Sequence, residues 1–376
     1  MNIWIIVLSA VALYGQSFVT PAQKQIALAE TEIAKEPKRA SGYNRLAVAY
    51  TRRAREISDT SYYDKGEEAL KKSFEIEPDN LEARKTTAWL AMGKHDFSLA
   101  LEIAKKLNAK NPDDVSIYGI LADANVELGN YDAAEKAVQT MLNLRPATVV
   151  SLSRASYLRE LFGDLDGAID LMSKACEMAG YDEREDRAWM LTQVAQLERK
   201  RGNRTEAERV VREALQLFPG YHYALGALSR IMIDSGKFEE AVVLEQERFG
   251  AAPHAENGFA LAVAQHKAGH LEESKKSFQS FELNSLRETE SKDNSNHELI
   301  FYYADYADQP EKALEIAKRE VLRRSDVHTL DAYAWALHVN GKHEEASKQM
   351  KRALAVGVKD PDILVHARSI AEKVTR

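Results

Sequence analysis

The sequence predicts an all-α protein, a solenoid of about nine helix pairs with a capping helix at each end. Three observations support this fold class. Six short turns share one pattern, in which a glycine is followed at the fifth position by alanine or serine. These glycines recur at a period of about 34 residues, with one longer step before Gly202 and a double step before Gly341. Prolines repeat at the same period, and no segment alternates polar and apolar residues with a period of two, so we expect no strands. The turns begin at Gly129, Gly163, Gly202, Gly236, Gly269 and Gly341, and the prolines are Pro78, Pro112, Pro146, Pro219 and Pro253.

Each marker of the repeat has a physical reason. Glycine ends the first helix of a pair because it adopts the left-handed backbone conformation at little cost. Acidic residues that follow, such as Asp132 and Glu239, favour the positive end of the second helix. The alanine lets two antiparallel helices approach closely, and the proline stops the second helix before the next pair. In such an array we expect each pair to cover only its neighbours.

The N-terminal segment is predicted to be a targeting signal. Residues 3–14 form an uncharged apolar run, which is too short to span a bilayer. Small residues follow up to Ser17, so we interpret residues 1–17 as a signal peptide and expect export to the periplasm or the extracellular space. No lysine or arginine precedes Lys24, whereas signal peptides carry early positive charge. An uncleaved membrane anchor over residues 3–19 therefore stays open, as does a buried first helix.

The rest of the chain divides into caps, helix pairs and one loop. The loop is expected because residues 287–296 read R-E-T-E-S-K-D-N-S-N, which is polar throughout. The eighth pair is the weakest match, because its turn at Asp308 lacks the glycine. We expect an N-terminal capping helix within 18–39, pairs one to seven within 40–288, the polar loop at 289–296, and pairs eight and nine with a C-terminal capping helix within 297–376.

A helix pair with a period of about 34 residues resembles the tetratricopeptide repeat family. The resemblance covers nearly the whole chain after the N-terminal segment, and it implies a right-handed α-solenoid. It also implies that the first helices form a concave groove that binds a peptide or protein partner. The expected function is therefore a non-enzymatic scaffold for protein–protein interaction. The third pair matches the family pattern best, at Tyr118, Leu121, Ala122, Gly129, Tyr131, Ala134, Leu142 and Pro146.

The groove should be formed by first-helix side chains that point away from the second helix. The residues at these positions are large and polar or aromatic, and Trp, Tyr and Arg often dominate binding energies. Solubility alone would explain the glutamines and acids, but it explains the aromatic residues less well. The predicted partner-binding residues are Asn44, Arg45, Lys85, Trp89, Asp123, Glu127, Arg154, Tyr157, Gln193, Gln196, Arg230, Phe259, Tyr302, Asp331 and Trp335.

Composition and motifs exclude several other functions. The 51 basic and 58 acidic side chains give a formal net charge of -7, which disfavours nucleic acid as a partner. The single cysteine, Cys176, excludes an internal disulfide. The nucleophile elbow, the dinucleotide fingerprint and the P-loop are absent. We therefore predict no enzymatic activity, no cofactor and no metal.

Two alternatives remain open from the sequence. His266 and His270 lie one helical turn apart and are the best candidates for a minimal metal or catalytic site, although they flank Gly269 and lack a third ligand. The other alternative is a structural role, in which the array associates with itself through an end cap.

Overall fold

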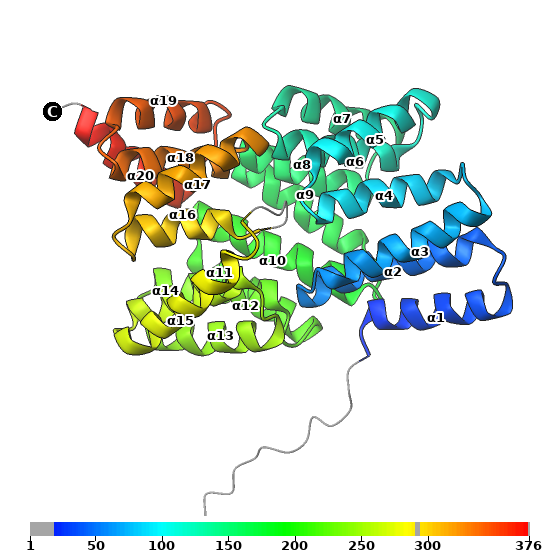
Figure 1. Cartoon of the computed structure of the whole chain (residues 1–376), viewed down its shortest axis with the longest axis horizontal. Coiled ribbons are helices and arrows are strands. Elements are labelled where there is room, and N and C mark those ends of the chain that lie inside the picture. Colours follow the sequence, from blue (N-terminus) through cyan, green and yellow to red (C-terminus); the bar gives the residue numbers. More distant parts are fainter. Residues whose placement is uncertain (1–18, 290–293, 375–376) are drawn as a thin grey trace, which may run out of the picture.

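The computed structural model describes residues 19–289 and 294–374, and within them it contains twenty helices and no strand. The predicted signal peptide lies outside the described residues. Helices α2 to α19 form nine consecutive antiparallel pairs, and Figure 1 shows them stacked side by side. The all-α solenoid predicted from the sequence is confirmed. No helix within the described residues is both long enough and apolar enough to span a membrane.

The helices follow the chain in a regular order. The N-terminal helix is α1 (Pro21–Lys35) and the C-terminal helix is α20 (Pro361–Val374). The first five pairs are α2 (Ala40–Ile57) with α3 (Ser61–Ile76), α4 (Leu81–Gly93) with α5 (Phe97–Lys110), α6 (Val115–Glu127) with α7 (Tyr131–Leu144), α8 (Val149–Leu161) with α9 (Leu165–Met178), and α10 (Arg184–Arg201) with α11 (Arg204–Leu217). The last four are α12 (His222–Asp234) with α13 (Phe238–Ala251), α14 (Ala255–Lys267) with α15 (Leu271–Ser285), α16 (Asn296–Asp305) with α17 (Pro310–Arg323), and α18 (Val327–Val339) with α19 (His343–Leu354).

The turn within each pair contains a residue with positive φ. The six turn glycines have φ between 73° and 89°. In the three pairs without such a glycine, Ser58, His95 and Asp308 take the left-handed conformation at 53°, 56° and 51°. Aspartate tolerates this region better than most residues, because its short side chain can hydrogen-bond locally. The eighth pair therefore keeps the architecture of the others without a glycine.

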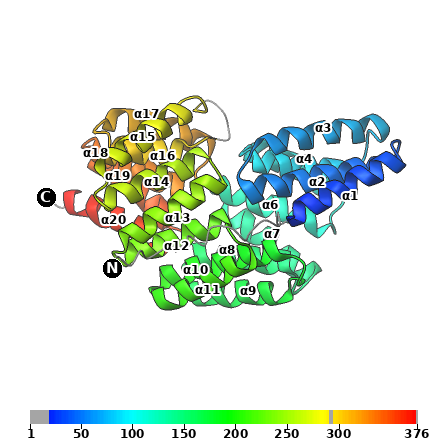
Figure 2. The ribbon, with the colours of Figure 1, turned by 90° about the horizontal axis from the view of Figure 1, so that it is seen from below.

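The first helices form the inner side of the solenoid. Along most of the array each first helix contacts the first helix of the next pair, as α2 contacts α4 and α4 contacts α6. The second helices lie outside them. The chain curls strongly: Figure 2 shows α1 to α4 on one side, α12 to α20 on the other, and α8 to α11 between them.

The expectation that each pair covers only its neighbours is wrong. The largest apolar cluster joins the third and fourth pairs, through residues such as Ala134 and Leu161, to the last three pairs and α20, through residues such as Leu330 and Ile363. The curl brings pairs that are distant in the sequence into contact along two seams.

The first seam joins the end of α2 to the start of α10. Arg52 donates a hydrogen bond to Asp186 over 2.8 Å. Arg55 donates from Nε to the fully buried carboxylate of Glu185 over 3.0 Å, and the hydroxyl of Tyr221 donates to the same carboxylate over 2.6 Å. These contacts connect the first pair to the fifth and sixth.

The second seam joins the turns of the third and fourth pairs to loops near the C-terminus. The backbone N–H of Val327 donates to the hydroxyl of Tyr131 over 2.9 Å. The ammonium of Lys200 lies 2.6 Å from Glu160 and 2.7 Å from Asp360, and so ties α8 and α10 to the start of α20.

Two turn glycines have a second role at this seam. A Cβ atom at Gly129 would lie 2.6 Å from the carbonyl oxygen of Ser325, and one at Gly163 would overlap the carbonyl oxygen of Gly357. At Gly236, by contrast, nothing lies within 4 Å of the added atom. Glycine is therefore required for the turn alone at Gly236, and for both the turn and the seam at Gly129 and Gly163.

Candidate protein-binding surface

A row of linked side chains crosses three consecutive first helices on the inner side of the solenoid. Arg154 on α8 binds Asp123 on α6 in a bidentate pair, with Nε–Oδ1 and Nη2–Oδ2 distances of 2.9 and 2.6 Å. The guanidinium of Arg154 lies 5.5 Å from the ring centroid of Trp89 on α4, a cation–π contact. Lys85 lies one helical turn before Trp89 on α4. We call Lys85, Trp89, Asp123 and Arg154 the central row.

The sequence makes room for this row with a glycine inside a helix. Gly119 lies in the first half of α6, where glycine costs roughly 0.5–1 kcal/mol relative to alanine. A Cβ atom there would lie 3.2 Å from the Cζ atom of Arg154. The missing side chain lets the guanidinium lie close against the backbone of α6. The row is therefore held in place before any partner arrives.

The charges of the row are compensated within the chain. The ammonium of Lys85 lies 2.6 Å from Glu82 and 2.9 Å from Asp114. Burial would lower the pKa of Lys85, but its hydrogen bonds to these two carboxylates outweigh burial and raise the pKa above its ordinary value. Lys85 therefore stays protonated at neutral pH.

The next part of the predicted groove contacts the second seam. Glu127 lies 3.3 Å from the guanidinium of Arg324 in the α17–α18 loop. Burial, together with the nearby carboxylates of Asp326 and Asp123, raises the pKa of Glu127 to about 7, although Arg324 opposes this change. Burial also raises the pKa of Tyr157, which packs against the largest apolar cluster. Glu127 is thus already engaged by the chain itself.

Three predicted groove residues are buried, contrary to the expectation that they face an open wall. Asn44 donates to Asn80 over 2.9 Å. Tyr302 is buried and stacks on Phe278, with ring centroids 5.1 Å apart. Asp331 is 4% exposed and lies 3.0 Å from Nδ1 of His366 on α20. The sequence phase placed them on the correct helices, but neighbouring elements cover these side chains.

Two aromatic residues near the C-terminal end also contact their own chain. The indole of Trp335 stacks on His366 of α20 with centroids 4.4 Å apart, and its Nε1–H donates to Asp305 over 2.8 Å. The ring of Phe259 lies 5.2 Å from that of Phe281. This end of the predicted groove is therefore occupied by intramolecular contacts.

The remaining predicted residues lie apart from the central row. The side chain of Arg45 is 66% exposed and pairs with Glu32 of α1. That of Arg230 is 62% exposed and lies 3.6 Å from Asp362 of α20. Gln193 and Gln196 are half-buried on α10.

The contacts of His266, His270 and Cys176 do not indicate a metal or catalytic site. His266 packs against the ring edge of Tyr306, with centroids 5.3 Å apart, whereas Nε2 of His270 lies 3.0 Å from Glu239. Residues 19–289 and 294–374 contain no group of three or more His, Cys, Asp or Glu that could hold a metal ion. Cys176 is buried, and burial raises the pKa of its thiol. A raised thiol pKa disfavours the reactive thiolate.

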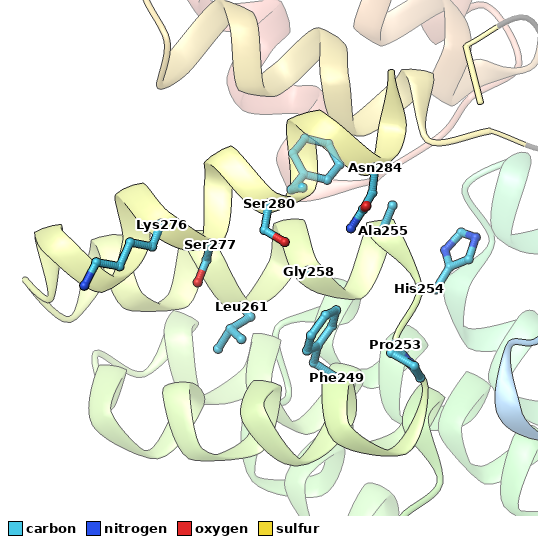
Figure 3. Close-up of a pocket in the computed structure, with 11 residues that line it drawn as sticks. Phe249, Pro253, His254, Ala255, Gly258, Leu261, Lys276, Ser277, Ser280 and Asn284 are labelled. Carbon is cyan, nitrogen blue, oxygen red and sulfur yellow. The ribbon is translucent and has the colours of Figure 1, made fainter. Parts of the chain in front are cut away.

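A small cavity of about 210 Å³ is lined by residues of α13, α14 and α15 (Figure 3). Phe249 and Leu261 line it from below, and Ser277, Ser280 and Asn284 extend from α15 above. Its volume is below the roughly 300–1,000 Å³ of typical ligand pockets. It would accommodate one side chain rather than a cofactor.

The structure also reveals residues that sequence reasoning missed. Arg55, Glu185, Tyr221 and Arg324 form the seams, although nothing in their local pattern distinguishes them from solvated charges. Glu185 is a partial exception, because it lies in helical phase with Ala188 and Ala195, which are buried on α10. Buried charges are paired, but the sequence cannot identify a partner that lies so far away along the chain.

Comparison with known proteins agrees with this architecture. A tetratricopeptide repeat family model matches residues 91–152, which include α6 and α7. No curated protein sequence matches the chain.

Solved structures resemble the chain in fold. The human IFIT1 dimer with PPP-AAAA superposes with a TM-score of 0.55 at 14% identity, covering 89% of this chain and 87% of that one. The human IFIT1 dimer with m7Gppp-AAAA gives 0.55 at 15% identity, covering 89% and 85%. A chain of the APC/C hetero-tetramer Cut9–Hcn1 gives a TM-score of 0.49 at 12% identity. The match covers 87% of this protein but only 55% of that chain.

At such identities the structural likeness shows the fold alone. The family match, the nine helix pairs and the positive-φ turns agree with one another. Together they support a tetratricopeptide repeat protein.

Proposed function

We propose that this protein is a non-enzymatic scaffold that binds a peptide or protein segment on the inner wall of its N-terminal half. The central row carries this proposal. It links an aromatic residue, an acid and a cation across three first helices, and the bidentate Arg154–Asp123 pair fixes its geometry. Lys85 adds a second cation one helical turn from Trp89. Preorganised side chains of this kind lower the entropy cost of binding.

We expect the partner to contact only part of the predicted groove. The last first helix, α18, is covered by α20, which engages Asp331 and Trp335. At the end of α6, Glu127 is also engaged, by Arg324 of the α17–α18 loop. The side chains of Trp89, Asp123 and Arg154 are half-buried, and the ion pair and cation–π contact that join them lie within α4, α6 and α8. We therefore place the partner against α4, α6 and α8.

Nucleic acid is the competing class of ligand, because the two IFIT1 structures contain PPP-AAAA and m7Gppp-AAAA. The charges of this chain favour a protein instead. Its formal net charge is -7, and Lys85 and Arg154 are both paired with carboxylates. A phosphate backbone is bound by uncompensated cations.

The proposal is tested by capture of a partner from the native source, using the full chain as bait and mass spectrometry as the readout. The variant Trp89→Ala with Arg154→Ala should lose the captured protein. The matched control replaces Tyr181 and Arg209 by alanine, because these are an exposed aromatic residue and an exposed arginine away from the inner wall. Circular dichroism checks that both variants stay folded, and Trp89→Phe should retain part of the capture.

If both double variants capture the partner equally well, the central row is not the binding surface. Capture that disappears after ribonuclease treatment would support nucleic acid instead. Stoichiometric metal in the purified protein, lost in His266→Ala, would favour the alternative of a metal or catalytic site.

We further propose that the protein is exported. The support is the apolar run of residues 3–14, followed by small residues. N-terminal sequencing of the protein from its native source tests this. A chain that begins near Phe18 supports a cleaved signal, whereas an intact N-terminus in the membrane fraction supports the anchor.

A further inference from the structure

A cleft of about 620 Å³ lies along the second seam, at the edge of the solenoid. One wall is the turn of the fourth pair, from Gly163 to Asp166, with Lys200 and Arg201 at the end of α10. The other wall is the start of α20 and the loop before it. The two walls come from distant parts of the sequence, so the cleft exists only because the solenoid closes.

The wall of the cleft formed by α20 carries exposed aliphatic side chains where a terminal helix should be polar. Ile363 and Ile370 form the buried face of α20. Its residues Leu364 and Val365 line the cleft and are 37% and 48% exposed. The last helix of a solenoid normally presents a polar outer face, because no further unit covers it. Neighbouring exposed aliphatic side chains in a cleft therefore indicate a binding surface.

The charges around the cleft are unevenly compensated. Four cationic and two acidic side chains line it, in a protein whose formal net charge is -7. Lys200 and Arg201 are paired, the latter with Asp166 over 2.8 Å. Lys359 and Arg368 are exposed and make no ion pair with any residue that the structure describes. The cleft thus combines exposed aliphatic side chains on α20 with two cations that form no ion pair among the described residues.

The nearby acid, Asp164, is mainly engaged by other groups: its pKa is lowered chiefly by the backbone N–H of Gly167 and by Arg159, and least by Lys359. The carboxylate of Asp164 accepts the backbone N–H of Gly167 over 2.9 Å and pairs with Arg159 over 2.6 Å. The stem of Lys359 passes over Gly163, where a Cβ atom would lie 3.2 Å from its Cε. The ammonium of Lys359 is therefore held at the rim of the cleft and remains available to a ligand.

We propose that this cleft binds an acidic peptide segment of a partner protein. Aliphatic or aromatic side chains of the segment pack against Leu364 and Val365, and its carboxylates approach Lys359 and Arg368. Complementary charge and an apolar contact together give both specificity and affinity. The surface lies on the edge of the solenoid, away from the central row, so this inference does not depend on the function proposed above.

The experiment is selection from a phage library of random dodecapeptides on the full chain, followed by fluorescence anisotropy with the best synthetic peptides. We expect selected peptides enriched in Asp or Glu together with Leu, Ile or Phe. Lys359→Glu with Arg368→Glu should weaken their binding at least tenfold. Lys351→Glu on α19 is the matched control, because it reverses an exposed charge away from the cleft.

A second variant tests the apolar walls. Leu364→Ala with Val365→Ala should also weaken binding, while the control Lys351→Glu should leave it unchanged. Peptides without an acidic bias, or binding that survives charge reversal at Lys359 and Arg368, would overturn the proposal. The selection of no peptide would also overturn it. So would a dimer that light scattering detects in the native protein and not in the charge-reversed variant, because the occupant of the cleft would then be a second copy of the chain.

Discussion

The dual role of the turn glycines gives a sharp prediction about closure of the solenoid. Gly129 and Gly236 have nearly the same backbone angle, with φ of 74° and 73°. Replacement by alanine should cost roughly 1–2 kcal/mol at either position, because a residue with a Cβ atom is strained in the left-handed region. Only at Gly129 does the new atom also meet a neighbour, the backbone oxygen of Ser325 at 2.6 Å.

That contact cannot relax by a side-chain rotation, so the second seam must separate locally in Gly129→Ala, where the α17–α18 loop meets the turn. Separation breaks the hydrogen bond from Val327 N–H to Tyr131 and the one from the Ser325 hydroxyl to the backbone. At about 1 kcal/mol each, these bonds add roughly 2 kcal/mol to the cost at Gly129.

Small-angle X-ray scattering and amide exchange measure the opening. The radius of gyration and exchange in the α17–α18 loop should rise in Gly129→Ala but not in Gly236→Ala. If the two variants behave alike in both measurements, the seam does not hold the solenoid closed.

Three further predictions follow from the seams. Glu185→Gln should lower stability by about 2 kcal/mol, because it removes the charge of a fully buried carboxylate that accepts hydrogen bonds from Arg55 and Tyr221, although Asp186 still pairs with Arg55. Glu183→Gln, at a half-exposed site, should cost well under about 1 kcal/mol, and equal melting temperatures of the two variants would contradict this. The pKa of Glu127, about 7 in the closed form and nearer 4.5 once exposed, means that the closed form retains a proton that the open form releases. Scattering should therefore show the second seam loosening as pH rises between about 5 and 8, and Glu127→Gln should abolish that dependence. Finally, Ala134→Trp should increase amide exchange in α18 as well as in adjacent pairs, because Ala134 and Leu330 belong to one apolar cluster; a loss of protection confined to α5–α8 would show that the cluster does not couple them.

The helix pairs could be predicted because their signals are local. A glycine that ends a helix acts within a few residues, and so does a proline that stops the next one. The turns without glycine are local as well: Ser58, His95 and Asp308 take the same left-handed conformation. The order of the elements therefore follows from short-range backbone preferences.

The candidate site was predicted only in part. The phase of the repeat correctly placed Trp89, Asp123 and Arg154 on first helices, and the structure brings these three together. The same phase placed Tyr302 and Asp331 in the groove, where they prove to be buried. Position on a helix sets the direction of a side chain, but the elements that cover it come from elsewhere in the chain.

The sequence by itself determined the repeat, the turns and the number of helix pairs, because each depends on contacts between residues close along the chain. Tertiary structure alone decided how tightly the array curls. Curvature is the sum of small rotations between successive pairs, and no single residue encodes that sum. Gly129 and Gly236 show the difference, since both occupy equivalent turns of the repeat, yet only Gly129 lies against the other end of the molecule.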